Sequence, residues 1–332
     1  MRYWIGWIIL CGASFLVGSG NGYGQDSPRL PAQVEGLAAQ YPGDVGIETD
    51  ARVLFRENFE SPTVEDLKSR WETVVRPDRM SFSEDKPGNS GGKQSLQMTH
   101  VGGDGDGSQL YRRLQPGQDQ VYARFYVKFD EDCAPIHHFG THLGGFNPST
   151  PWPQGGAGTR PDGGKRFTSG VEPHGAKWEW DFYSYWQGMH QHGDGNYWGT
   201  PFLAGAAKPQ VEKGKWICVE MMLKMNQPVD EANGEQAFWI DGQLWRVDGQ
   251  IASHIGPGFP KGRWSGGWWH PDPTSDTSFE GFLWRNVEEL TINYLWTYLY
   301  ITKAPEGHVS KVWFDDIVVA TEYIGPLATV EK

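Results

Sequence analysis

The sequence predicts an all-β protein built as a single antiparallel β-sandwich with long loops. Its 332 residues include 44 glycines and 22 prolines, and 14% are aromatic; this composition is typical of many short strands joined by ordered loops. Segment after segment alternates apolar and polar residues at period two, and none shows a convincing helical period. With no internal repeat, one sandwich accounts for the whole pattern.

The first 50 residues are expected to precede this domain. Residues 1–24 have the features of a secretory signal peptide: a basic Arg2, an apolar run over 4–17 and small residues near the cleavage region. Residues 25–50 lack periodicity and are expected to form a flexible linker, so that the sandwich covers 51–328. No later apolar run reaches the ~20 residues of a membrane span. We therefore expect a secreted or periplasmic protein that does not insert into a membrane.

The net charge limits which ligands are expected, and the cysteine count bears on disulfide formation. The net charge of -12 argues against general binding to nucleic acid. It also means that a site for an acidic glycan must contain basic side chains of its own.

Removal of the signal peptide leaves two cysteines, Cys133 and Cys218. In an oxidising compartment one disulfide is the default expectation, with two buried free thiols as the alternative.

Strands are expected from residue 53 onward, at 53–60, 71–75, 95–100 and 109–114. The segment 121–129 then alternates strictly. We expect its apolar face to fill the core between two sheets. The members of that face are Val121, Ala123, Phe125, Val127 and Phe129. The opposite face carries Tyr122, Arg124, Tyr126 and Lys128. We expect this face to line a substrate groove, with a face exposed to water as the alternative.

A histidine-rich segment follows, with His137, His138 and His142 within six residues. Their spacing matches no zinc signature, so a transition-metal site is the lesser hypothesis. A histidine has a pKa near the pH at which most enzymes work, which makes His137 and His138 candidate bases. A Gly- and Pro-rich loop then leads to Arg166.

The stretch from Lys177 to Trp186 contains the largest group of candidate catalytic side chains. Read at period two, it places large rings on one face. The other face carries Glu179, Asp181, Tyr183 and Tyr185. Carboxylates and phenols are the usual acids and bases of glycan cleavage, so this strand predicts the floor of a sugar-binding groove. An ordinary strand with one solvated face explains this stretch, taken alone, equally well.

The C-terminal third supplies further candidate binding residues. The alternating strand at 216–226 carries Glu220 and Lys224, and the long Trp-rich segment 251–281 is expected to wall a site. The strand at 290–301 aligns four aromatic side chains: Tyr294, Trp296, Tyr298 and Tyr300. Such a row is either a platform on which sugar rings stack or an aromatic row of the core.

Asp315 and Asp316 lie on the closing strand at 312–319. Terminal strands often pair, which would bring these carboxylates to Glu57 on the first strand. Oxygen ligands of this kind predict a structural Ca²⁺, with a pair of surface carboxylates as the alternative. No cofactor is expected to be required for catalysis.

Several C-terminal motifs resemble the secreted polysaccharide lyases of the alginate and glucuronan type, within the concanavalin-like jelly rolls. Residues 215–226 read W-x-x-x-E-x-x-x-K-x-N, residues 233–242 end in a W-x-D-G hairpin, and residues 312–326 read W-F-D-D-I-V-V…Y-I-G-P. The resemblance covers about 52–326 and implies a jelly roll with its site on the concave sheet. It places the Y-x-Y pair Tyr183 and Tyr185 in that site, together with Arg166. The second arginine of the family pattern is missing here.

The leading hypothesis is a polysaccharide lyase that cleaves a uronic-acid-containing glycan by β-elimination. Tyr183 or Tyr185 would act as acid and base, and His137 or His138 is the alternative base. The substrate carboxylate would be neutralised by Arg124, Arg166 and Lys224.

Two alternatives remain open at this level. A glycoside hydrolase would use Glu179, Asp181 and Glu220. A non-catalytic, lectin-like module would use Tyr294, Trp296 and Tyr298 only to bind the glycan.

Overall fold

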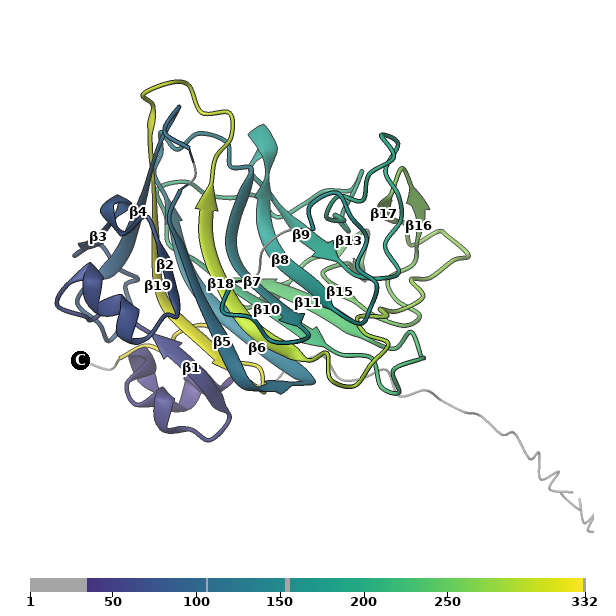
Figure 1. Cartoon of the computed structure of the whole chain (residues 1–332), viewed down its shortest axis with the longest axis horizontal. Helices are drawn as coiled ribbons and strands as arrows, with labels where there is room; N and C mark the ends of the chain where they lie inside the picture. The colour runs from purple at the N-terminus through teal and green to yellow at the C-terminus, as the bar shows by residue number, and fades with distance from the viewer. Residues whose placement is uncertain (1–34, 106, 153–155, 331–332) are drawn as a thin grey trace, which may run out of the picture.

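The computed structural model describes residues 35–105, 107–152 and 156–330, and its regular structure consists of strands and short 3₁₀ helices (Figure 1). The predicted all-β class is therefore confirmed. Two antiparallel sheets form a sandwich between Val53 and Ala320. Within the described residues no helix is long and apolar enough to cross a membrane.

One sheet has six strands in the order β2-β5-β18-β7-β8-β9. These strands are β2 (Thr73–Val75), β5 (Gln109–Gln118), β7 (His138–Phe146), β8 (Arg166–His174), β9 (Glu179–Tyr185) and β18 (Ile292–Tyr300). Because every neighbouring pair is antiparallel and in register over most of its length, residues from distant parts of the chain share one face of this sheet.

The other sheet has nine strands. Its main path runs β12-β11-β10-β6-β19-β4-β3, with β1 paired to β19 and β15 paired to β11. These strands are β1 (Val53–Glu57), β3 (Met80–Ser83), β4 (Ser95–Val101), β6 (Gln120–Phe129), β10 (Ile217–Lys224), β11 (Glu235–Ile240), β12 (Gln243–Leu244), β15 (His254–Ile255) and β19 (Val309–Ala320).

Two small hairpins and several short 3₁₀ helices lie outside the two main sheets. Two small hairpins pair β13 (Arg246–Val247) with β14 (Gln250–Ile251), and β16 (Gly262–Ser265) with β17 (Trp268–Pro271). The 3₁₀ helices are η2 (Leu37–Gln40), η3 (Pro42–Asp44), η4 (Ile47–Thr49), η5 (Val64–Ser69), η6 (Pro77–Arg79) and η7 (Gly175–Lys177).

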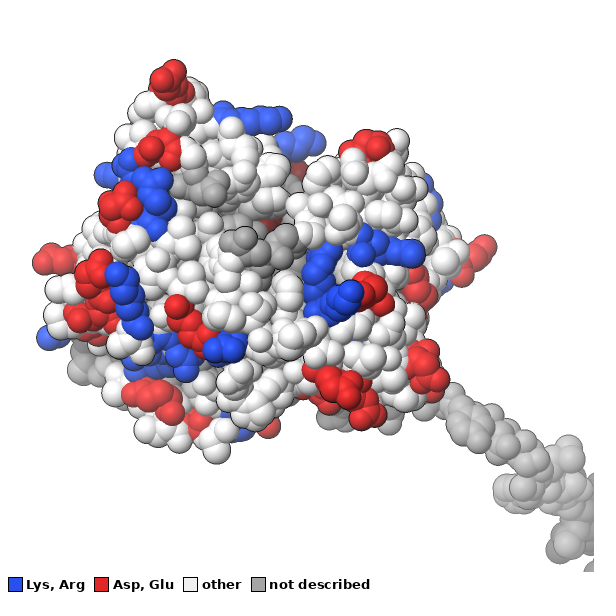
Figure 2. Space-filling view, in the orientation of Figure 1, with Lys and Arg blue, Asp and Glu red and all other residues white. Residues whose placement is uncertain are grey.

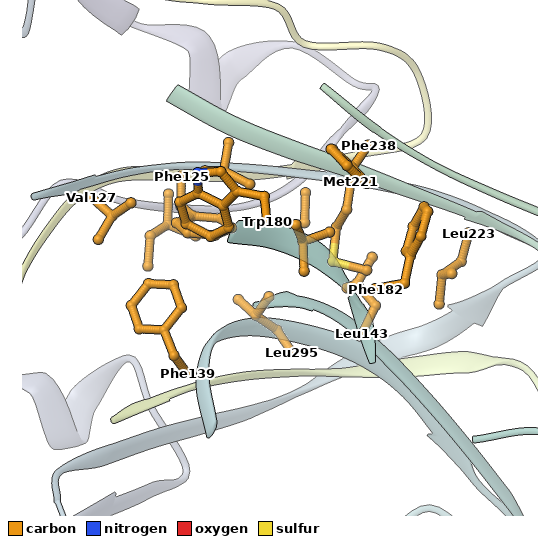
Figure 3. Packing of buried hydrophobic residues seen from close by; sticks show 14 of the residues in the cluster. Phe125, Val127, Phe139, Leu143, Trp180, Phe182, Met221, Leu223, Phe238 and Leu295 are labelled. Carbon is orange, nitrogen blue, oxygen red and sulfur yellow. The ribbon is translucent and has the colours of Figure 1, made fainter. Parts of the chain in front are cut away.

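The main core lies between the two sheets (Figure 3). The apolar face predicted for 121–129 is confirmed, because all five of its members are fully buried. Phe125 meets Phe139 at a ring-centroid distance of 6.4 Å, and Phe139 meets Trp180 at 6.0 Å. Burial of each such large side chain stabilises the sandwich by about 1.5–3 kcal/mol.

Both ends of the described chain cover the outer face of the nine-stranded sheet. Leu37, Ala38 and Ile47 are buried there in a second apolar cluster with Tyr122 and Trp239. Residues 35–50 are therefore not the flexible linker that was expected. Their 3₁₀ helices of three or four residues are too short to show a helical period. Residues 1–34, with the expected signal peptide, lie outside the described residues.

The two cysteines are buried free thiols, which corrects the default expectation of a disulfide. Cys133 belongs to the core between the sheets. Cys218 lies on β10 opposite Tyr126 of β6, on the outer face of the nine-stranded sheet. The two thiols thus lie on different sides of the nine-stranded sheet.

Candidate active site

A groove of about 790 Å³ lies on the face of the six-stranded sheet that points away from the core. Figure 2 shows this side of the molecule hollowed beside the lobe that carries β16 and β17, with basic and acidic side chains interspersed around it. The floor comes from β7, β8, β9 and β18, and the far wall comes from the loop at 192–201 and from Trp268 of β17. The titratable lining residues are His137, His138, His142, Arg166, Glu172, His174, Tyr183, Tyr185, His192, Tyr298 and Tyr300.

Glu172 is at the centre of the floor. Its side chain is 2% exposed, and two histidines from β7 approach its carboxylate. His138 Nδ1 lies 3.2 Å from Glu172 Oε2, and His142 Nε2 lies 2.9 Å from Glu172 Oε1. The hydroxyl of Tyr298 on β18 also donates to Oε1, at 3.2 Å. Three strands thus converge on a single buried carboxylate.

Gly170 makes room for this arrangement. It faces His142 in the register of β7 and β8. A Cβ atom at position 170 would lie 1.9 Å from the His142 ring, well inside van der Waals contact. The absent side chain therefore lets the imidazole lie flat across β8 and reach Glu172.

The pKa values of two adjacent histidines in the groove, His137 and His138, are shifted in opposite directions. Burial alone would lower the pKa of His138, but the Glu172 carboxylate outweighs it and raises that pKa. Burial and the neighbouring charge of His138 both lower the pKa of His137. Burial would raise the pKa of Glu172, yet the two histidines hold it below its ordinary value. As the pH rises, His137 therefore loses its proton first, and His138 retains its proton to higher pH.

Tyr183 lies beside this cluster. Its ring centroid is 4.6 Å from that of His138, and its hydroxyl is 3.3 Å from the hydroxyl of Tyr185. Burial, together with Tyr185, raises the pKa of Tyr183 far above its usual range. The phenol is therefore protonated and able to donate a proton.

The aromatic row on β18 faces the groove along most of its length. Trp296 and Tyr298 stack at 4.1 Å with an interplanar angle of 14°, and Tyr300 stacks on His138 at 6.0 Å. All three line the groove. Tyr294 does not, because its ring is 1% exposed and lies beneath Gly144 of β7. The row is a platform at one end and part of the protein interior at the other.

Arg166 lines the groove beside Tyr185, with its guanidinium carbon 6.0 Å from the centroid of that ring. Nη2 donates to the backbone oxygens of Gly156 and Thr159 at 3.0 and 2.9 Å. No carboxylate in the described part of the chain pairs with it.

Five of the predicted substrate-binding residues lie on the opposite sheet and so outside the groove, which corrects the expectation for them. They are Tyr122, Arg124 and Tyr126 on β6, and Glu220 and Lys224 on β10. Both strands belong to the nine-stranded sheet, and their polar face is turned away from the six-stranded sheet. Arg124 is fully buried against Asp44.

This polar face of β6 and β10 anchors the C-terminal segment instead. Glu220 accepts hydrogen bonds from the amides of Ile324 and Gly325 at 2.7 and 2.8 Å, and the Tyr126 hydroxyl accepts one from Leu327 at 2.9 Å. Burial raises the pKa of Glu220 to about 7. The glutamate of the W-x-x-x-E motif thus has a structural role in this chain.

The two carboxylates predicted on β9 are engaged in the local structure. Asp181 is fully buried, accepts the amides of Phe202 and Leu203, and pairs with Lys208 at 3.0 Å. Glu179 lies at the end of β9 near Gln210, 3.4 Å away. Neither residue lines the groove.

The predicted Ca²⁺ ligands are brought together only in part. β1 does pair with β19, but Glu57 is occupied by Arg70 and the Trp71 indole at 3.0 Å each. One oxygen of Asp315 and both of Asp316 are buried and without a hydrogen-bond partner. Within the described residues no three His, Cys, Asp or Glu side chains form a group that could hold a metal ion. The carboxylates of Asp315 and Asp316 offer oxygen ligands of the kind that Ca²⁺ binds, whereas that of Glu57 is already hydrogen-bonded within the protein.

Glu172 and His142 were not among the residues assigned to the site from the sequence. One signal was present: Arg166, Thr168, Glu172 and His174 recur at period two along β8. The signal is weak because only the pairing of β7 with β8 shows that this polar face meets His138 and His142.

No family model and no curated protein matches the sequence, but solved structures match the fold. The alginate lyase Aly36B has a TM-score of 0.51 at 12% identity, over 82% of this chain and 98% of that chain. A mutant of that lyase in complex with alginate tetrasaccharide gives 0.53 at 12% identity over the same shares. Alginate lyase vAL-1 from Chlorella virus gives 0.51 at 12% identity, over 80% and 100%. The chain therefore has the jelly-roll fold of these lyases, as the resemblance in its sequence predicted.

Proposed function

We propose that this protein is a secreted polysaccharide lyase that cleaves a uronic-acid-containing glycan by β-elimination in the groove. The observation that carries the proposal is the cluster of His138, Glu172 and Tyr183 on the groove floor. It combines a histidine whose pKa is raised by a buried carboxylate with a protonated phenol, and the two ring centroids are 4.6 Å apart. The fold that the chain shares with alginate lyases supports the same chemistry.

Positive charge in the groove prepares the substrate. The proton at C5 of a uronic acid is removed only when the adjacent carboxylate is neutralised, because negative charge then builds up on that group. Protonated His138 and Arg166 supply this neutralisation. Glu172 keeps His138 charged and holds its ring in place, although the protein as a whole carries a charge of -12.

Two further groups move the protons. His137, neutral at the working pH, takes the proton from C5, and the electron pair forms the C4=C5 double bond. The C4–O bond breaks, and the departing glycosidic oxygen receives the proton of the Tyr183 phenol. Solvent then carries the proton from His137 back to Tyr183. The aromatic platform of Trp296, Tyr298 and Tyr300 supports the sugar rings.

The structure does not favour the glycoside hydrolase hypothesis. Asp181 is buried and accepts hydrogen bonds from the backbone amides of Phe202 and Leu203. Glu220 belongs to the opposite sheet. No pair of carboxylates among the described residues that line the groove is available for acid and base work, because Glu172 is the single carboxylate in that lining.

Incubation with alginate, glucuronan and neutral glucans tests the proposal. A lyase generates an unsaturated uronate, which is followed by its ultraviolet absorbance. New reducing ends without that chromophore would instead indicate a hydrolase. Retardation of the protein in a glycan-containing gel without any cleavage would indicate a binding module, and either outcome refutes the lyase.

A further inference from the structure

A second hollow, of about 480 Å³, adjoins the groove at the loop that connects β7 to β8. Arg166 lines both spaces, so its side chain lies at their boundary. The other lining residues used below are Trp152, Arg160, Asp162 and Lys165. None of them belongs to the cluster that performs the proposed elimination.

The hollow is rich in positive charge. Arg160, Lys165 and Arg166 line it, with Asp162 as the acidic member 3.7 Å from Lys165. Neither Arg160 nor Arg166 forms an ion pair with a carboxylate of the described residues, although the chain contains 41 Asp and Glu. Two guanidinium groups without carboxylate partners in one hollow are suited to an anionic ligand, because arginine binds carboxylates in a bidentate manner.

An aromatic surface leads from the groove into the hollow. Trp152 lies edge-on to Trp296 of the groove platform at 6.1 Å between ring centroids. Trp152 also contacts Tyr111 of β5 at 6.1 Å, and the Tyr111 hydroxyl bonds the backbone oxygen of Thr150 at 2.6 Å. The indole is therefore fixed in position and only partly buried, as a stacking surface for a sugar requires.

Backbone contacts hold the basic residues in place without a ligand. The Asn147 amide bonds Lys165 O at 2.8 Å, which closes the base of the loop. The Tyr197 amide bonds Gly158 O at 3.0 Å, and the Arg160 guanidinium lies over the Tyr197 ring at 5.5 Å. Because these described parts of the loop are tied at both positions, little ordering entropy at Arg160 and Lys165 opposes binding.

We propose that this hollow is a further subsite that selects an anionic sugar unit of the glycan beside the unit being cleaved. The carboxylate of that unit binds Arg160, and its ring lies against Trp152, while Arg166 stays with the unit being cleaved. The assignment of the ligand as part of a polyuronate rests on the proposed function. It predicts that affinity grows with chain length once a glycan is long enough to fill both spaces.

Binding of defined oligosaccharides tests the subsite separately from catalysis. Alginate and glucuronan oligosaccharides, and the same oligosaccharides after chemical reduction of their carboxyl groups, are titrated calorimetrically into protein carrying Tyr183→Phe. Arg160→Gln in this background should weaken binding of the acidic oligosaccharides about tenfold, or about 1.4 kcal/mol, and leave binding of the reduced ones unchanged. Arg263→Gln, the same charge change at an exposed residue of β16 outside both spaces, is the matched control.

The outcomes separate the two proposals. Equal affinities with and without Arg160→Gln, an equal loss for acidic and reduced oligosaccharides, or no binding at all overturns the subsite. If the parent protein releases no unsaturated product while the Arg160 effect persists, the lyase proposal fails and the anionic subsite stands. Thermal unfolding of each variant shows that the fold is retained.

Discussion

Glu172 differs from the other acidic residues near the groove in having two histidines and a tyrosine as partners. The consequence is a separation of roles between His137 and His138, which are neighbours in the chain. His138 lies against the Glu172 carboxylate, which raises its pKa. His137 lies beside the charge of His138, which lowers the pKa of His137. Opposed pKa shifts of adjacent groups are a recurrent means of obtaining a base and an acid at one pH.

Tyr183→Phe tests the phenol as the proton donor. The substitution removes one hydroxyl and keeps the ring packed against His138, so glycan binding should be retained. The rate of unsaturated product formation should fall by about 10²–10⁴-fold, as expected for loss of a general acid. Unchanged turnover would remove Tyr183 from the mechanism.

Glu172→Gln tests the electrostatic control of His138. In the parent protein, activity should rise with pH as His137 loses its proton at a lowered pKa, and fall at higher pH as His138 loses its proton at a raised pKa. Loss of the Glu172 charge lowers the pKa of His138, so the high-pH limb should move to lower pH. The pH profile of kcat/KM measures this shift. Glu306→Gln at an exposed turn is the charge-matched control, and equal profiles would contradict the assignment.

At the scale of elements, β6 and β10 place their polar face under the two ends of the described chain. Arg124 of β6 meets Asp44 of η3 and the backbone oxygens of Asp316 and Gly325. These contacts bring the segment 35–50 and the C-terminal segment onto one sheet. The polar residues of β6, predicted to bind substrate, therefore stabilise the fold.

Asp44→Asn should destabilise the protein strongly. It leaves the fully buried guanidinium of Arg124 without a counter-charge, and removal of one partner of a buried pair costs about 3–5 kcal/mol. Denaturant unfolding followed by tryptophan fluorescence measures the loss. Glu65→Gln, which breaks the exposed pair of Glu65 with Lys68, should change the free energy of unfolding by about 0–1 kcal/mol. Equal effects of the two variants would show that Asp44 is not needed to hold this segment.

Ca²⁺ binding at β19 is testable by stability. Burial and mutual repulsion raise the pKa of Asp315, and burial raises that of Asp316 to about 6. A Ca²⁺ ion bound by these carboxylates relieves the repulsion. The midpoint of thermal unfolding should therefore rise with added Ca²⁺ and fall with a chelator, by about 2.7 kcal/mol in stability at 100 times the Kd. Asp316→Asn should abolish the difference, and no response of the parent protein to Ca²⁺ would refute the site.

For the molecule as a whole, the sandwich keeps its two thiols apart and out of solvent. Burial raises the pKa of Cys133 to about 12 and that of Cys218 still further. Both thiols should therefore resist alkylation in the folded protein and react in denaturant without any reductant. Mass spectrometry of the peptides that contain Cys133 and Cys218 measures how far each thiol is alkylated. Labelling that requires a reductant would instead establish the disulfide.

Much of the architecture was predictable because period two is a strong local signal. The core face of β6 follows from alternation, and so does the shared face of Trp296 and Tyr298 on β18. The placement of Arg124 and Glu220 was not predictable in this way. Alternation shows which side chains share a face, but it does not show what covers that face.

The sequence by itself determined the β-sandwich, the inward faces of its strands and which aromatic side chains share a strand face, because each is set by neighbours two residues apart. Only the tertiary structure decided that Glu172 joins His138 and His142, that β6 and β10 turn their polar face to the chain ends, and that the thiols stay apart. These outcomes depend on which strands pair and which layer they enter. Such contacts join residues tens to hundreds of positions apart, and no local pattern records them.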